Sequence, residues 1–348
     1  MKNRLAALSA LSLFALAPVA ANACATCGCT LSSDAATGYS AGPGWRVDLQ
    51  FSYIDQSQLR IGTHSVSAPQ VAALNDAGGS QEVEKDTTNR YWTLGVSYSP
   101  DEDWTANIQL PYVDRSHSTY GAATSDQLNS ANLSGSSFGQ LGDVRLMGSY
   151  QGILPTKNLG IQVGIKLPTG AYGGQNMMTG EQAGRHPVYF SSGPGAAAGQ
   201  AIDTSLQPGT GSTDLIVGAY YYQAVSQDFD AFVNARYQVA TFEALDQAGA
   251  NYRPGNLLTI SAGIRYEHSP DWTPQLQVNY THKSTDQGAL ADITDSAGDV
   301  VYLSPGVSLN LATGLSVYGF VQVPIYSDLV GYQLFPRWTA NAGVSYAF

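Results

Sequence analysis

The chain ends with the stretch WTANAGVSYAF, residues Trp338–Phe348, in which apolar and polar side chains alternate. Because successive side chains of a β-strand point to opposite faces, this alternation predicts a strand with one apolar and one polar face. The stretch lacks the 3.6-residue apolar spacing of an amphipathic helix. Its length also suits a tilted strand that crosses a bilayer, which takes about 9–11 residues.

The same alternation recurs from residue 45 onward and predicts about twelve strands. The alternating runs cover residues 47–53, 92–98, 104–112, 144–150, 159–167, 215–221, 231–239, 258–266, 276–280, 301–309, 315–323 and 338–348. Short connections alternate with long ones, and the third long connection, residues 168–212, is the longest. Short turns at one end and long loops at the other are typical of a transmembrane up-and-down antiparallel β-barrel, which is the predicted fold of residues 44–348.

Composition supports this interpretation and excludes several other classes. Charged residues make up 12% of the chain, about half the usual share for a soluble protein. The 21 Tyr, 10 Phe and 5 Trp argue against disorder. The formal net charge of −11 argues against nucleic acid as a partner. No apolar run of about 18 residues, as a membrane helix needs, follows the N-terminal segment.

The N-terminal segment Met1–Ala23 has the pattern of a secretory signal peptide. Lys2 and Arg4 precede an apolar run, and Ala21-Asn22-Ala23 matches a cleavage site. A lipid-anchored Cys24 is the alternative, although Ala21 and Asn22 depart from the usual lipidation pattern. We therefore expect a periplasmic segment at residues 24–43, and an outer-membrane barrel of a Gram-negative-type cell. An even number of strands would place both termini in the periplasm.

Aromatic residues recur near the strand ends and predict two girdles at the membrane interfaces. The inner girdle would comprise Tyr98, Tyr150, Tyr221, Tyr266 and Tyr346, and the outer girdle Tyr112, Tyr237, Tyr280 and Trp338. Such rings sit between lipid and water, although the β-propensity of Tyr alone would also enrich strands. The terminal Phe348 resembles the C-terminal signature of bacterial outer-membrane barrels. That resemblance implies recognition by the barrel-assembly machinery.

The opposite face of each strand would line the lumen. The charged residues on it are Arg46, Arg145, Lys166, Arg236 and Arg265 against Asp48, Asp143, Asp214, Asp230 and Glu267. Five basic residues face five acidic ones, so this set carries no net formal charge. The lumen could be closed by paired charges, or it could be a narrow polar channel. The loop at residues 168–212 could fold inward and gate it, or it could remain external.

Three short motifs carry a resemblance to a known family. They are LGDV at Leu141–Val144, KLPTG at Lys166–Gly170 and GTGSTDL at Gly209–Leu215. With them, residues 141–239 resemble the outer-membrane transporter family named for the "MetA-pathway of phenol degradation". The resemblance implies a barrel that passes small, often hydrophobic or aromatic, compounds. Asp143 and Asp214 match the motif aspartates of the family, and we expect a structural role for them at the rim of the lumen.

All three cysteines of the chain, Cys24, Cys27 and Cys29, fall within six residues. Thiolates at this spacing can bind Cu or Zn, but a disulfide in the oxidising periplasm is the alternative. No other cofactor is required. The histidines at positions 64, 117, 186, 268 and 282 show no metal-ligand spacing. We found no G-x-S-x-G motif, and the Arg115–Ser118 segment, which holds a Ser–His pair, is expected in a loop. We therefore expect no enzyme.

The sequence thus predicts an outer-membrane channel for small solutes, whose partners are membrane lipid, the assembly machinery and the solute. Two alternatives remain open at this point. One is a non-conducting barrel whose cysteine segment binds a metal or a redox partner. The other is a structural or adhesive barrel that uses its acidic loops.

Overall fold

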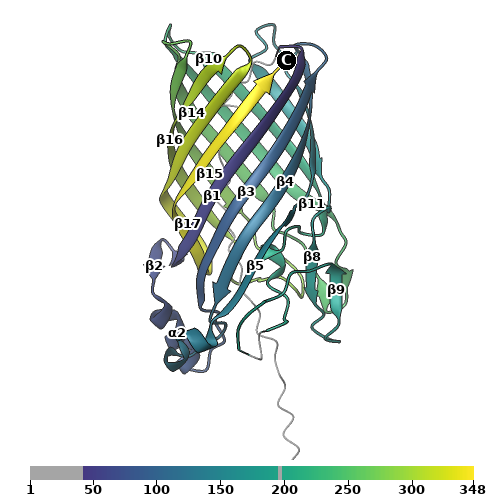
Figure 1. Cartoon of the computed structure of the whole chain (residues 1–348), viewed down its shortest axis with the longest axis vertical. Helices are drawn as coiled ribbons and strands as arrows, with labels where there is room; N and C mark the ends of the chain where they lie inside the picture. Colours follow the sequence, from purple (N-terminus) through teal and green to yellow (C-terminus); the bar gives the residue numbers. More distant parts are fainter. Residues whose placement is uncertain (1–41, 195–197) are drawn as a thin grey trace, which may run out of the picture.

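The computed structural model describes residues 42–194 and 198–348. Eleven antiparallel strands hydrogen-bond in the order β17-β16-β15-β14-β11-β10-β7-β6-β4-β3-β1, and β1 pairs back onto β17 (Figure 1). The predicted all-β antiparallel barrel is therefore confirmed. No helix within the two described ranges is both long and apolar enough to cross a membrane.

The bounds of the barrel strands are β1 (Gly44–Gly62), β3 (Glu84–Ser99), β4 (Trp104–Thr119), β6 (Arg145–Tyr150), β7 (Leu159–Lys166), β10 (Ser212–Ala224), β11 (Phe229–Glu243), β14 (Leu257–Tyr266), β15 (Trp272–Lys283), β16 (Gly298–Ala312) and β17 (Leu315–Ala347). Two short strands extend the sheet, with β2 (His64–Val66) on β1 and β5 (Ser134–Leu141) on β4. The remaining elements lie in the long loops and are β8 (Tyr172–Gln175), β9 (Gln182–Arg185), β12 (Asp246–Gln247), β13 (Ala250–Asn251), α2 (Ala68–Asp76) and the 3₁₀ turns η1 (Ser125–Gln127), η2 (Ser130–Asn132) and η3 (Thr204–Leu206).

The last strand explains why eleven strands are found where the sequence predicted about twelve. β17 has 33 residues, against 19 in β1. β16 pairs with its first half, up to Leu329, and β1 pairs with its second half. The two ends of β17 lie close together. The Ala347 N–H at the end of the strand donates to the carbonyl of Gly314, the residue just before the strand, at 2.8 Å. β17 therefore doubles back, with Gly331 at a φ of 72° near the reversal, and covers two of the predicted runs.

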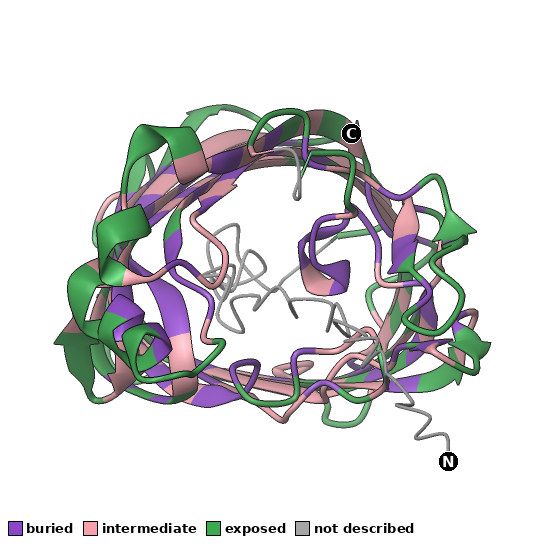
Figure 2. Cartoon of the chain, turned by 90° about the horizontal axis from the view of Figure 1, so that it is seen from below, coloured by how far each residue is buried: buried purple, intermediate pink, exposed green. Residues whose placement is uncertain are grey.

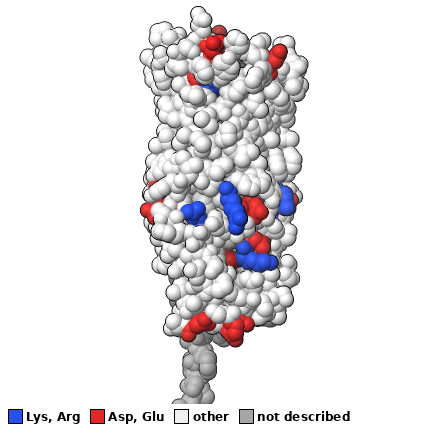
Figure 3. Space-filling model, turned by 90° about the vertical axis from the view of Figure 1, so that its left-hand side faces the viewer, with Lys and Arg blue, Asp and Glu red and all other residues white. Residues whose placement is uncertain are grey.

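The outer face of the barrel is apolar over one band. In β7, for example, Ile161, Val163 and Ile165 are exposed, while Gln162 and Lys166 are buried. Figure 3 shows, on one face of the molecule, a band without charged atoms between the charges near one end and a belt of charges at mid-height. Exposed apolar surface of this extent indicates contact with lipid rather than water.

Aromatic rings border this band at both of its edges. Near the short turns, Trp45 lies 4.7 Å from Tyr98 and Trp104 lies 4.6 Å from Tyr150, measured between ring centroids. At the other edge, Phe51 pairs in the same way with Trp92 at 4.5 Å and Tyr53 with Trp338 at 5.8 Å.

The length of β4 between the two edges fits the apolar band of a membrane barrel. Trp104 and Tyr112 lie at opposite edges of the band on this strand. The separation between them is about 26 Å along the strand at about 3.3 Å per residue. Because barrel strands are tilted by about 35–45°, this length spans about 20 Å along the membrane normal, which approaches the usual apolar band about 25 Å tall.

The strands continue beyond this band at the long-loop end, which the sequence analysis did not predict. β4 runs on from Tyr112 to Thr119, so the segment Arg115–Ser118 lies in a strand and the prediction of a loop was wrong. Its outward residues, Asp114 and Ser116, are polar because this part of the barrel projects into water. A strand with two polar faces has no apolar alternation, and its sequence therefore resembles a loop.

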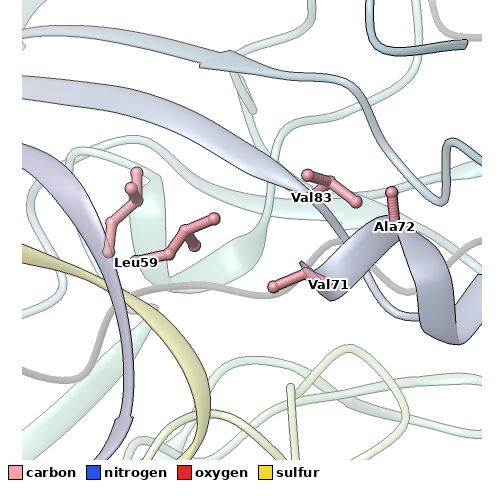
Figure 4. Packing of buried hydrophobic residues seen from close by; sticks show 5 residues of the cluster. Leu59, Val71, Ala72 and Val83 are labelled. Carbon is pink, nitrogen blue, oxygen red and sulfur yellow. The ribbon is translucent and has the colours of Figure 1, made fainter. Parts of the chain in front are cut away.

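Helix α2 lies at the long-loop end of the barrel (Figure 1), and Figure 4 shows its Val71 and Ala72 beside Val83. Its side chains Val71 and Ala72 are fully buried and pack against Val83, with Leu59 of β1 in the same cluster. The helix begins after Ser67, whose N–H donates to Gln70 Oε1 at 2.8 Å. With only nine residues, α2 is too short to show a clear helical period, and the sequence analysis missed it.

A charge placed in the apolar band should destabilise the barrel strongly. We expect Val163→Arg to lower the free energy of unfolding in lipid vesicles by about 2–4 kcal/mol, because Val163 is 55% exposed on the outer face of β7. Val163→Ala is the matched control and should cost clearly less, since it adds no charge. Equal losses for the two variants in denaturant titrations would contradict a lipid-facing position.

Candidate solute pathway

A cavity of about 360 Å³ opens inside the barrel near the short turns. Its wall is formed by inward side chains of β1, β3, β4, β6, β7, β10, β11 and β17. The polar and aromatic groups on this wall are Arg46, Asp48, Ser97, Asn107, Gln109, Gln162, Arg236, Tyr220 and Tyr318. Small-molecule sites commonly measure about 300–1,000 Å³, so the cavity can hold one small organic molecule.

The ten charged residues predicted to line the lumen fall into separate groups. Arg46, Asp48 and Arg236 line the cavity, where Arg236 Nη2 donates to Gln162 Oε1 at 3.3 Å. Near the short turns, Arg265 Nη2 lies 2.9 Å from Glu267 Oε1, and Asp230 is the cross-strand neighbour of Arg265.

Three other predicted residues, Asp143, Lys166 and Asp214, form a buried ion cluster. Lys166 Nζ lies 3.0 Å from Asp143 Oδ2 and 3.3 Å from Asp214 Oδ2. All three side chains are at most 7% exposed. The cross-strand register places Arg145 next to Lys166 and Lys166 next to Asp214.

The same cluster fixes both ends of the third long loop. Asp143 Oδ1 accepts the Gly170 N–H at 3.0 Å, and Asp143 Oδ2 accepts the Thr210 N–H at 3.0 Å. Lys166 Nζ also donates to the Ser212 carbonyl at 3.0 Å. Residues of all three family-like motifs therefore meet in one place, and they hold the entry and the exit of the loop at the barrel wall.

The third long loop folds against the inner wall, one of the two outcomes the sequence left open. Ile202 and Leu206 are buried and pack with Phe190, next to the inward side chain of Phe138 on β5. Figure 2, which looks along the barrel from the long-loop end, shows segments that lie inside the ring of strands. The loop therefore occupies part of the lumen at this end.

Arg115 anchors this loop, and the sequence analysis missed its role. Its side chain points inward from β4, is buried, and donates to the Leu206 carbonyl, to Asn89 Oδ1 at 2.5 Å and to Tyr91 Oη at 2.6 Å. The signal that could have revealed it is the continued alternation of inward residues past Tyr112. This signal was hidden by the polar outer face of the strand.

Acidic side chains converge at the long-loop end and change the charge balance predicted for the lumen. The buried members are Glu82, Glu84, Asp203, Asp286, Asp292 and Asp295, which come from three separate segments. Burial and the neighbouring Glu82 raise the pKa of Glu84 well above its usual value. Burial and, among its neighbours, Asp292 do the same to the pKa of Asp203. Burial raises the pKa of Asp295 to about 6, against a hydrogen bond from Gln81.

These raised pKa values predict that the long-loop end loosens as the pH rises. Between pH 4 and pH 6 the folded loop keeps a proton on Asp295 that the unfolded loop releases, because its ordinary pKa is 3.8. Stability is therefore lost as the pH rises through about 6, by up to about 3 kcal/mol from this group. We expect faster hydrogen exchange in residues 284–297 at pH 7.5 than at pH 5, after correction for intrinsic rates.

Asp295→Asn is the control for this pH effect, because it removes the titrating group but keeps its size. The difference in exchange between the two pH values should shrink in this variant. An exchange rate that is equal or slower at pH 7.5 in the unmodified protein would contradict the interpretation.

Several predicted features lie outside the described residues or are kept apart by the fold. The signal peptide and Cys24, Cys27 and Cys29 fall in residues 1–41, outside the described ranges. In residues 42–194 and 198–348, no group of three or more His, Cys, Asp or Glu side chains could hold a metal ion. Ser116 and His117 are neighbours in β4, so they point to opposite faces and cannot act together.

The family model described as "Putative MetA-pathway of phenol degradation" matches residues 195–328. This match confirms the resemblance seen in the sequence, but it differs in extent. It contains the motif Gly209–Leu215, whereas the LGDV and KLPTG motifs precede it. The expected range, residues 141–239, shares only its last part with the match, which continues through β16 and into β17.

Solved structures resemble this chain at low sequence identity. An outer membrane channel from Pseudomonas putida F1 is 13% identical, covers 89% of this chain and 98% of its own, and has a TM-score of 0.58. The toluene transporters TbuX of Ralstonia pickettii and TodX of P. putida have TM-scores of 0.43 and 0.42 at 11% identity. Both matches cover 94% of this chain, and they cover 95% of the TbuX chain and 96% of the TodX chain. No curated protein matches the chain.

Proposed function

We propose that this protein is an outer-membrane channel that passes small solutes through the lumen of its barrel. The observation that carries the proposal is the cavity of about 360 Å³, lined by polar side chains, inside a barrel whose outer face is apolar. A closed barrel satisfies its backbone hydrogen bonds in lipid, and its inner face can stay hydrated. The fold shared with the channel from P. putida F1 supports this proposal.

The solute that fits best is a small organic molecule with one ring and few charges. The cavity combines the guanidinium groups of Arg46 and Arg236 with carboxamides, hydroxyls and the rings of Tyr220 and Tyr318. Such a wall can hydrogen-bond a hydroxyl group and contact an aromatic ring. The description of the matching family model, which names phenol degradation, supports the same class.

We propose that the short turns and both chain ends face the periplasm, and that the long loops face the exterior. Phe348, which is exposed at the short-turn end and lies 5.6 Å from Tyr346 between ring centroids, would then be available to the assembly machinery. A solute entering from outside would pass the inward-folded third loop before it reaches the cavity.

Flux into proteoliposomes tests the proposal. We expect vesicles that contain the protein to take up phenol faster than protein-free vesicles, and to take up a polar solute with two or more rings much more slowly. Arg115→Ala, which should release the third loop, is tested beside the unmodified protein. The channel proposal would be contradicted if vesicles with neither protein took up phenol faster than protein-free vesicles.

A further inference from the structure

Four side chains that line the cavity each lie over a glycine, which belongs to the adjacent strand in three cases and to the other half of β17 in the fourth. The pairs are Asp48 over Gly95, Met147 over Gly164, Tyr220 over Gly160 and Tyr318 over Gly343. The first three pairs are direct cross-strand partners in the sheet. At each of these glycines an added β-carbon would fall well inside van der Waals contact with the side chain that lies over it.

This arrangement holds the bulky side chains flat against the barrel wall. Inward side chains of a barrel normally project across the lumen. Because Gly160 has no side chain, the ring of Tyr220 can lie against the strand instead, where its hydroxyl donates to Gln151 Oε1 at 2.9 Å. Tyr318 lies against Gly343 in the same way, and this residue is 5% exposed.

The same arrangement recurs beside both tyrosines on the same two walls. Phe232 lies over its cross-strand partner Gly263 and packs next to Tyr220. Phe320 lies over its partner Gly306 and packs next to Tyr318. The walls that carry these two aromatic pairs are separated by β14, β15 and β16 in the barrel.

We infer that the inward glycines under Tyr220 and Tyr318 set the width of the pathway and so determine which solutes pass. A methyl group at either glycine has to push the ring away from the strand, and the cavity is the space on the other side of the ring. Optimal carbon contacts are about 3.5–4.0 Å long, so the ring must move inward by more than about 1 Å. This inference rests on the proposed channel function.

The test compares matched glycine substitutions in the full-length protein. We expect the double variant Gly160→Ala/Gly343→Ala to take up phenol into proteoliposomes at least about tenfold more slowly than the unmodified protein. Gly319→Ala is the control, because a β-carbon on Gly319 in β17 would meet nothing within 4 Å. It should leave uptake unchanged. Uptake by the folded double variant that equals the control would overturn the inference.

Removing the rings provides the second arm and guards against a folding defect. Adding Tyr220→Ala and Tyr318→Ala to the double variant should restore phenol uptake. The two Tyr→Ala changes alone should let a two-ring solute such as naphthol pass at least several-fold faster. Heat-modifiable migration in electrophoresis shows whether the glycine variants fold. If they do not, naphthol uptake by the Tyr220→Ala/Tyr318→Ala variant becomes the deciding measurement, and unchanged uptake would overturn the inference.

The two proposals fail in different ways. A protein that passes no solute, both unmodified and with Arg115→Ala, refutes the channel function. The role of the glycines alone is refuted by a different result. In that case the unmodified protein passes phenol, and the glycine and tyrosine variants pass phenol and naphthol at the same rates as the unmodified protein.

Discussion

Replacing Lys166 with Met is expected to lower the free energy of unfolding by about 3–5 kcal/mol, because the change leaves two buried carboxylates without their cation. Lys166 Nζ contacts both Asp143 and Asp214, and all three side chains are almost completely buried. Denaturant titration in lipid vesicles, followed by tryptophan fluorescence, measures the loss. The third long loop should also become more sensitive to protease, since the cluster holds both of its ends.

The surface ion pair of Lys157 provides a matched control. Lys157 Nζ lies 2.6 Å from Glu102 Oε2, a shorter distance than either contact of Lys166, but both side chains are partly exposed. Exposed pairs contribute about 0–1 kcal/mol, so Lys157→Met should have little effect. Adding Asp143→Asn and Asp214→Asn to Lys166→Met should recover much of the lost stability. If Lys166→Met costs no more than Lys157→Met, the buried cluster does not stabilise the barrel.

Replacing Arg115 with Ala is expected to release the third loop from the inner wall and to raise phenol uptake about tenfold. The substitution leaves the buried Leu206 carbonyl without the donor that Arg115 provides. Loss of a hydrogen bond to a buried group costs about 1–3 kcal/mol, and each 1.4 kcal/mol changes an equilibrium about tenfold. Uptake into proteoliposomes and protease cleavage within residues 198–212 are the two measurements.

Arg90→Ala is the control for Arg115→Ala, since Arg90 lies on the adjacent strand β3. Its side chain is partly exposed and its Nη1 lies 3.5 Å from Asp114 Oδ1, away from the third loop. It should change neither uptake nor cleavage. An Arg115→Ala protein with unchanged uptake and a protected loop would show that the loop does not limit passage.

The barrel itself could be predicted from the sequence because alternation is a local property. In β7, and in β15 as far as Tyr280, every second residue is apolar. Lipid on one side and a polar interior on the other then leave no alternative assignment of the two faces. The prediction failed where that contrast ends. Beyond Val113 both faces of β4 are polar, so the part of the strand that carries Arg115 resembles a loop in the sequence.

For the candidate site, the sequence predicts which residues point inward but not which of them contact one another. Inward charges such as Asp143, Lys166 and Asp214 were assigned from their strand positions, but their meeting depends on the register of β6, β7 and β10. Register is a tertiary property that one sequence does not reveal. The same holds for Gly160 and Gly343, whose importance depends on the ring that lies over each of them.

Tertiary contacts also decide where the acidic residues lie. Glu84, Asp203 and Asp292 are far apart in the chain, and each resembles a solvated loop residue in the sequence. Only the folding of three loops into one end of the barrel buries them together. The neutral charge balance predicted for the lumen therefore applies to the charged strand residues, and it does not extend to the long-loop end.

Lipid contact of alternate residues along β15 is the most decisive measurement for a membrane-spanning barrel. In a protein freed of its native cysteines, Leu276→Cys and Val278→Cys would carry a fluorophore on the exposed face, and Gln277→Cys and Asn279→Cys on the buried inner face. We expect strong quenching by brominated lipids at positions 276 and 278, and weak quenching at 277 and 279. Equal quenching at all four positions, or none at any, would contradict a barrel with a lipid-facing exterior and a hydrated lumen.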